Sequence, residues 1–118
     1  MAKVLFVDDR PNETIRQWER SGCEGDHELL PLEPFASIER TCQLVRDFDP
    51  SIIFIGYGLS KSGVTGADVI RALRHQGYAG RIVANSGGGA EQFAGAGVEV
   101  DATADRQPKK LADILERN

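Results

Sequence analysis

Two adjacent carboxylates, Asp8 and Asp9, follow directly after the apolar run of residues 4–7. Mg²⁺ takes oxygen ligands and is usually held in proteins by one or two carboxylates together with water molecules. Phosphoryl transfer to a carboxylate would require a further acid at the end of the neighbouring apolar run, residues 52–55. Gly56 stands at that position and supplies neither a nucleophile nor a side-chain oxygen. The acidic pair therefore predicts a weak Mg²⁺ site, and the alternative is that the two acids cap the helix that follows them.

A second group of residues with chemical potential follows the apolar run of residues 81–84. It consists of Ser86 and three consecutive glycines, Gly87, Gly88 and Gly89, ahead of an expected helix. Backbone N–H groups of such glycines can bind an anion, but the sequence matches neither the Walker A pattern nor GxGxxG, so a flexible turn is the simpler interpretation. Tyr57 lies between two glycines and could stack on a ligand or cover the site; we favour covering.

Apolar runs alternate with amphipathic stretches along the whole chain, which predicts strands alternating with helices. Continuous apolar strands are typical of a parallel sheet that is covered by helices on both faces. Strands are expected at 3–7, 28–32, 51–55, 81–84 and, more weakly, near 98–103; helices are expected from Pro11, from Ile38 to just before Asp49, from Ala67 to Gln76, from Ala90 to Ala96 and from Pro108.

The expected fold is α/β, a flavodoxin-like (βα)5 arrangement of three layers. Right-handed crossovers favour a parallel five-stranded sheet in the order 2-1-3-4-5. In such sheets the functional crevice lies beyond the carboxyl ends of the strands, so Asp8, Asp9, Gly56 and Ser86 are expected to meet there. Residues 1–118 are long enough for one core and are expected to form a single domain.

Composition argues against several classes of function. The chain has 14 basic and 18 acidic residues, a formal net charge of −4 and no dense Lys/Arg cluster, so direct nucleic-acid binding is not expected. No run approaches the roughly 18 apolar residues that a membrane-spanning helix needs. Cys23 and Cys42 lack the spacing of a metal site, which favours two free thiols in a reducing cytoplasm.

The chain resembles, over its whole length, the receiver (CheY-like) domains of two-component response regulators. The resemblance lies in Val7-Asp8-Asp9, in residues 66–70 and in Ala96-Gly97. It implies that Asp8, Asp9 and the backbone carbonyl of Gly58 would hold Mg²⁺, and that residue 56 is the position of the phosphoacceptor aspartate. It also implies that Ser86 is the switch hydroxyl, which would bond a phosphoryl oxygen.

Three departures from the family's pattern indicate a domain outside the phosphorylation cycle. Gly56 replaces the acceptor. The family's lysine at the end of the fifth strand has no match, because ungapped counting places Ala104 there while Lys109 and Lys110 lie later. The family's aromatic switch position falls near Asp101, which is not aromatic.

We therefore expect a receiver-like signalling module, a pseudo-receiver, that acts by protein–protein contact and not as an enzyme. The resemblance implies that the last two helices and the last strand, roughly residues 90–117, form the contact surface. Phe93, Arg106, Lys109 and Lys110 are candidates for this surface, although Phe93 could equally pack inward. A kinase, an output domain or a second copy of the chain are the expected partners, and the sequence does not choose among them.

Two other functions remain open from the sequence alone. The first is a small-ligand or nucleotide-binding domain that uses Tyr57 and the loop Gly87–Gly89. The second is a phosphorelay receiver with a non-standard acceptor. Ser60, Ser62 and Thr65 lie near residue 56, but a hydroxyl needs a base and forms a stable ester rather than a labile acyl phosphate.

Overall fold

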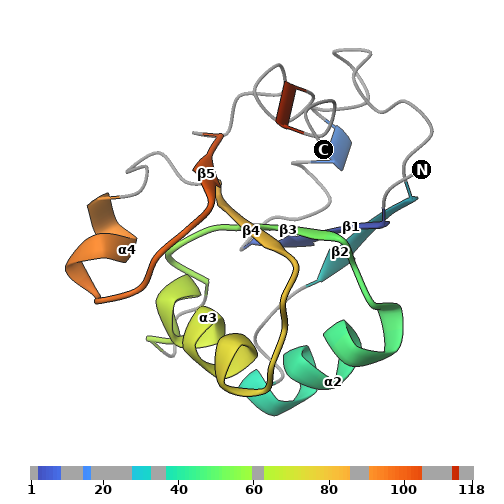
Figure 1. Cartoon of the computed structure of the whole chain (residues 1–118), viewed down its shortest axis with the longest axis horizontal. Helices are drawn as coiled ribbons and strands as arrows, with labels where there is room; N and C mark the ends of the chain where they lie inside the picture. Colours follow the sequence, from blue (N-terminus) through green and yellow to red (C-terminus); the bar gives the residue numbers. More distant parts are fainter. Residues whose placement is uncertain are drawn as a thin grey trace.

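The computed structural model describes residues 3–8, 15–16, 28–32, 37–59, 63–85, 91–104 and 113–114. The strands in these ranges are all paired in parallel, in the order β2-β1-β3-β4-β5 (Figure 1). The α/β class with a parallel sheet, expected from the sequence, is confirmed. The strand bounds are β1 Lys3–Val7, β2 Glu28–Leu32, β3 Ile52–Ile55, β4 Arg81–Ala84 and β5 Ala102–Thr103.

The described helices are α2 (Ile38–Phe48), α3 (Gly66–His75) and α4 (Glu91–Gly95), each within one residue of the expected bounds. Ser37 Oγ begins α2 by accepting the N–H of Arg40 at 3.0 Å. The helices expected from Pro11 and Pro108 lie outside the described residues, apart from the helical pairs 15–16 and 113–114. No helix within the described ranges has the length and apolar character that crossing a membrane requires.

Strand β5 is shorter than the stretch near 98–103 in which it was expected. It covers only Ala102–Thr103. The residue before it, Asp101, bonds β4 through its side chain as well as through its backbone. The N–H of Ile82 donates to the Asp101 carboxylate (2.7 Å), while the N–H of Asp101 donates to the carbonyl of Ile82 (2.8 Å). The carboxylate thus takes the place that a backbone carbonyl of a longer strand would occupy, and regular pairing begins only after residue 101.

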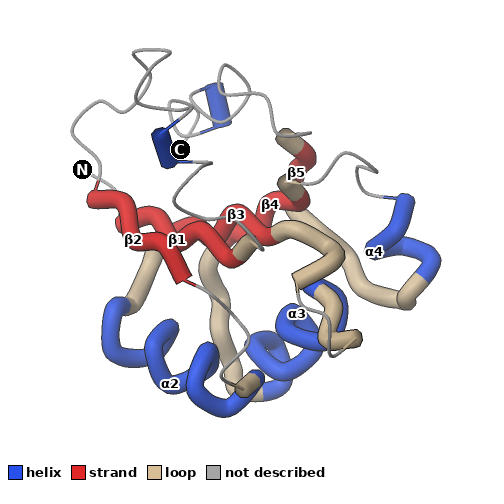
Figure 2. The backbone as a smooth tube through the Cα atoms, turned by 180° about the vertical axis from the view of Figure 1, so that it is seen from behind, coloured by secondary structure: helices blue, strands red, loops and turns tan. Residues whose placement is uncertain are grey.

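The side chains of the strands alternate between two faces of the sheet, and both faces are buried. Leu5 and Val7 belong to a cluster that includes Cys42 and Val45 of α2 and Leu73 of α3. Both helices lie on this one face, as two views from opposite sides show (Figures 1 and 2). The cluster on the other face consists of Val4, Phe6, Ile52, Phe54, Val83 and Ala104, with partly buried Ile15 and Ile114 packed against it.

Cys42 lies in the core, on the buried face of α2. Its side chain is buried and its thiol is free. Burial raises the pKa of the Cys42 thiol, and the nearby charge of Arg46 lowers it by less. The thiol is therefore protonated at neutral pH and acts as a small apolar residue. Cys23 lies outside the described residues.

Tyr78 ties the end of α3 to the start of β3. Its hydroxyl donates to the carbonyl oxygen of Pro50 at 3.0 Å, and the guanidinium carbon of Arg74 lies 5.7 Å from the centre of its ring. Burial raises the pKa of Tyr78 to about 12; Arg74 opposes this rise, whereas Asp49 and Asp101 add to it. Folding therefore favours the neutral phenol.

We predict that Tyr78→Phe reduces the loss of stability at alkaline pH. An unfolded tyrosine ionises near pH 10, whereas the pKa of folded Tyr78 is about 12. The stability linked to the neutral phenol is therefore complete below about pH 10 and is lost as the pH rises through the folded pKa. Urea unfolding followed by circular dichroism should show a steeper decline above pH 10 for the wild type than for Tyr78→Phe. At neutral pH the variant should lose only about 1 kcal/mol, for one hydrogen bond. Parallel declines would contradict the prediction.

Candidate functional site

Four residues stand in a row where neighbouring strands end. The last residues of β1, β3, β4 and β5 are paired with one another in register, so the residues that follow them also align. We call these residues the carboxyl-end row: Asp8, Gly56, Asn85 and Ala104. The N–H groups of Gly56, Asn85 and Ala104 each donate, at 2.8 Å, to the carbonyl of the last residue in the adjacent strand of the sheet: Val7, Ile55 and Ala84. Asp8 is the one ionisable residue of this row.

Gly56 lies directly beside the buried carboxyl group of Asp8. A Cβ atom built on Gly56 would lie 3.7 Å from Cγ and 3.8 Å from Oδ1 of Asp8, which is ordinary van der Waals contact. The backbone of Gly56 is also not in the left-handed region, so a side chain would not be strained there. Asp8 itself is 1% exposed. Position 56 can therefore accept a side chain, and the first atoms of that side chain would face the Asp8 carboxyl group.

Several site residues expected from the sequence lie outside the described residues. These are Asp9, Ser86, Gly87, Gly88, Gly89, Arg106, Lys109 and Lys110. Their proposed roles stay predictions. Asn85, which precedes Ser86, is described, and its side chain is buried at the carboxyl-end row. Asn85 was not among the site residues predicted from the sequence, although its position directly after the apolar run of β4 was a usable signal.

The fit of Mg²⁺ to this edge of the sheet depends on how many oxygen ligands converge. Within the described ranges, no group of three or more His, Cys, Asp or Glu side chains gathers at ligand spacing. Asp8 is a buried carboxylate at this edge, and the backbone carbonyl of Gly58, in the loop that follows β3, stays a predicted second ligand. Mg²⁺ can be held by one or two carboxylates when it keeps several waters, so these residues fit a weak site only.

The loop between β3 and α3 closes back onto itself beside Gly56. The N–H of Gly66 donates to the carbonyl of Tyr57 at 2.6 Å, and Gly58 and Thr65 form an isolated antiparallel bridge. A Cβ atom on Gly66 would overlap the carbonyl oxygen of Gly56 and approach Cε1 of Phe93 to 2.9 Å. The start of α3 can therefore reach the end of β3 only because residue 66 has no side chain.

Phe93 is buried, so its placement on the partner-contact surface was wrong. Its side chain is 0% exposed although it belongs to the short helix α4. Its ring meets the ring of Tyr57 edge to face, with centres 5.3 Å apart and planes at 88°. Together with its approach to Gly66, this contact removes Phe93 from solvent because the apolar ring fills the space beside the closed loop. The packing of Tyr57 agrees with a covering role.

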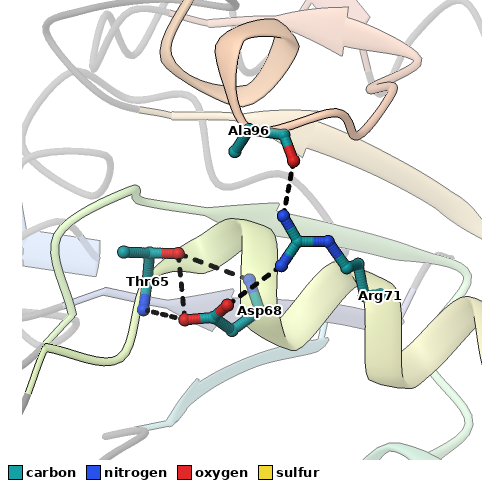
Figure 3. Close-up of polar contacts among 4 residues, drawn as sticks. All are labelled: Thr65, Asp68, Arg71 and Ala96. Atoms are coloured by element: carbon teal, nitrogen blue, oxygen red, sulfur yellow. Dashed lines mark hydrogen bonds and ion pairs between the residues drawn. The ribbon is translucent and has the colours of Figure 1, made fainter.

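A polar network runs from this loop along the exposed face of α3 (Figure 3). Thr65 and Asp68 form a capping box: the Thr65 N–H donates to Asp68 Oδ2 (3.0 Å), and the Asp68 N–H donates to Thr65 Oγ1 (3.3 Å). The backbone bond from Thr65 is the main cause of a lowered pKa for Asp68. Arg71 bonds Asp68 Oδ1 at 3.0 Å and also donates to the carbonyl oxygen of Ala96.

Helical periodicity puts Arg71 on the outer face of α3, but no sequence pattern predicts both of its contacts. The spacing of Thr65 and Asp68 is the sequence signature of a capping box and could have identified the first half of the network. The contact with Ala96 joins residues 25 positions apart, and no local pattern predicts it. The hydroxyl of Thr65 is engaged in the cap, which weakens its candidacy as a substitute phosphoacceptor.

Solved receiver domains have the same fold over nearly the whole chain. A LuxR-family DNA-binding response regulator from Staphylococcus aureus matches with a TM-score of 0.75 and 15% identity, over 99% of this chain and 98% of its own. The chemotaxis protein CheY4 of Vibrio cholerae gives 0.74 and 19%, over 99% and 98%. The response regulator TrrA of Thermotoga maritima, solved in complex with Mg²⁺ and BeF, gives 0.71 and 17%, over 99% and 98%.

Sequence comparisons identify no relative of this chain beyond these structural matches. Neither a protein-family model nor a curated protein matches this chain. At the identities above, the structural likeness establishes the receiver fold, and function has to be argued from the residues at the site.

We predict that Gly56→Asp makes the stability of the protein depend on Mg²⁺. The new carboxylate would lie beside that of Asp8, and two such charges about 5 Å apart repel by roughly 3 kcal/mol at an effective dielectric constant of about 20. Without divalent ions the variant should therefore lose about 1–3 kcal/mol in urea unfolding at neutral pH. Millimolar Mg²⁺ should restore most of this loss, because the cation neutralises the cluster.

Gly56→Asn is the matched control for this prediction. It places a side chain of the same shape at residue 56 but adds no charge, so its stability should change little with Mg²⁺. An equal response of the two variants to Mg²⁺ would show that shape rather than charge governs the site.

We predict that Gly66→Ala is strongly destabilising. Its Cβ atom would overlap the backbone oxygen of Gly56, the residue directly after the central strand β3, so either α3 or the end of β3 must move. Overpacking of this kind costs about 1–3 kcal/mol, measured by urea unfolding. Gly95→Ala is the control, because a Cβ atom at this second helical glycine meets nothing within 4 Å. Similar losses in the two variants would contradict the role of Gly66.

Proposed function

We propose that the chain is a receiver-like signalling module that acts by protein contact and is not phosphorylated at the usual position. The observation that carries this proposal is the position of Gly56 in the carboxyl-end row, beside the buried carboxyl group of Asp8. The fold brings the acceptor position to the acidic residue that would serve it, and that position has no side chain. The module would therefore be retained for its surfaces rather than for phosphoryl transfer.

The far end of the row supports the same conclusion. The N–H of Ala104 donates to the carbonyl of Ala84 just after β5, and the methyl side chain of Ala104 is fully buried. In the receiver family a lysine at this place would balance the charge of a phosphoryl group. An alanine cannot do so, and Asp101, near the family's aromatic position, is engaged with the backbone of β4 instead.

We further propose the architecture and contacts of the whole chain. Residues 1–118 would form one (βα)5 domain with five strands in the order 2-1-3-4-5. The contact surface would comprise residues 90–117, with Arg106, Lys109 and Lys110 and with Glu91 and Gln92, which are exposed on α4, in place of the buried Phe93. A protein partner, either a kinase, an output domain or a second copy, would bind there in the cytoplasm. No enzymatic step is required of the module.

Mg²⁺ has a secondary place in this proposal. One similar receiver, from Thermotoga maritima, was solved with Mg²⁺ and BeF. Here Asp8 and the carbonyl of Gly58, with Asp9, would hold the ion weakly through several waters. Such an ion would neutralise the acidic end of the sheet, and without an acceptor at residue 56 it would have no phosphoryl group to orient.

We predict that the wild-type protein takes up no phosphoryl group from acetyl phosphate and Mg²⁺. Intact-mass spectrometry measures uptake directly. In NMR spectra, beryllofluoride added at constant Mg²⁺ should leave the amide signals of Gly56 and Asn85 without a saturable shift, because residue 56 supplies no acceptor carboxylate for the fluoride complex. A receiver domain with its acceptor aspartate, treated in parallel, gives the positive control. Stoichiometric uptake by the wild type, or a saturable shift at these amides, would refute the proposal.

A further inference from the structure

Helix α4 is a single turn that depends on its neighbours for its position. It spans only Glu91–Gly95, and isolated helices of that length do not form in water. Two contacts from the β3–α3 region hold it. The first is apolar, between Phe93 and the closed loop at Tyr57 and Gly66, as described above.

The second contact is polar and meets α4 where it ends. The N–H of Ala96 bonds the carbonyls of Gln92 (3.2 Å) and Phe93 (3.1 Å), so Ala96 closes the helix. Its own carbonyl oxygen accepts from the Arg71 guanidinium, a cation at the end of a helix where positive charge is favoured. The other side of that guanidinium bonds Asp68, which also caps α3 at Thr65.

A second arginine, one turn later on α3, holds the start of β5. Arg74 bonds Asp101 Oδ2 at 3.2 Å, and the same carboxylate accepts the N–H of Ile82 in β4. The connection from α4 to β5 is thus fixed at both ends by α3. Between these two points it turns through Gly97, whose φ of 80° is in the left-handed region. Movement of α4 about this turn needs release of the Arg71 bond and of the Phe93 ring from the loop, but leaves the Arg74–Asp101 contact intact.

We propose that Arg71 is a latch that couples the β3–α3 loop to α4. With the capping box intact, Asp68 orients the guanidinium toward Ala96 and α4 stays closed on the loop. A change in the loop that releases Asp68 would free the guanidinium, and α4 would open while Arg74 keeps β5 in place. The latch would give this chain a route to alter its α4 surface that does not pass through residue 56.

The solvent exposure of the Arg71–Asp68 ion pair determines how much the latch contributes to stability. The side chains of Arg71 and Asp68 are 51% and 40% exposed, and exposed ion pairs contribute little to global stability. Local opening of one helical turn costs far less than unfolding, so the same contact can change the population of open α4 several-fold. The latch should therefore be visible in local exchange and nearly invisible in global unfolding.

Amide hydrogen exchange measured by NMR tests the latch. The N–H groups of Ala96, Gly97 and Val98 bond carbonyls within α4, at 3.0–3.2 Å, and report its opening. In Arg71→Met, which keeps the length of the side chain but removes its charge and donors, these amides should exchange about three to ten times faster. Arg71→Lys should recover part of the protection, and Thr65→Val should produce a smaller rise at the same amides.

Arg74→Met is the matched control, since it removes the neighbouring arginine and should affect Asp101 rather than residues 96–98. The Gly56 amide, bonded within the sheet, serves as the reference for global opening. The latch is refuted if Arg71→Met leaves residues 96–98 within about twofold of the wild type, or if the Gly56 amide accelerates equally. It is also refuted if Arg74→Met has the same effect as Arg71→Met.

The link from α4 to a partner rests on the proposed function, whereas the latch itself does not. The latch and its link to a partner can therefore be refuted independently of each other. Faster exchange at residues 96–98 supports the latch whatever the protein binds. Self-association of the wild type and of Arg71→Met, measured by analytical ultracentrifugation, tests one partner, a second copy of the chain. A dimer that weakens in Arg71→Met supports the link to α4, and a dimer of unchanged strength refutes the link for this partner.

Discussion

The close approach of α3 to the end of β3 is the contact on which the rest of this arrangement depends. The N–H of Gly66 bonds the loop at Tyr57, and the absence of a side chain at residue 66 lets the two backbones touch. Phe93 fills the remaining space with its ring edge. The alignment of α3 along the sheet, and the apolar seat of α4, therefore depend on one close backbone approach at the carboxyl end of the central strand.

Elements with a strong periodic pattern were predictable from the sequence. The apolar runs gave β1, β3 and β4 nearly to the residue, and α2 ends where Asp49-Pro50 indicated, with Asp49 in the left-handed conformation. The last strand was harder to place, because its start is set by the Asp101 carboxylate rather than by hydrophobic alternation. A side-chain contact of that kind leaves no periodic signal in the sequence.

The candidate site was predictable where it depends on strand register and unpredictable where it depends on packing. The meeting of Asp8 and Gly56 follows from two parallel strands that end together. A lone aromatic in a one-turn helix carries no pattern that tells buried from exposed, which is why the placement of Phe93 was wrong. The bond from Arg71 to Ala96 spans 25 residues, and only the folded arrangement reveals it.

Gly56 and Gly66, which lie at the two ends of the β3–α3 loop, differ in what their replacement costs the protein. At Gly66 the fold itself forbids a side chain, whereas at Gly56 there is room for one and no backbone strain against it. Glycine is thus a structural necessity at one position and a chemical choice at the other. The barrier to a phosphoacceptor in this chain is accordingly not steric: there is room for a carboxylate at residue 56, and Ala104, at the other end of the row, carries no charge that could balance it.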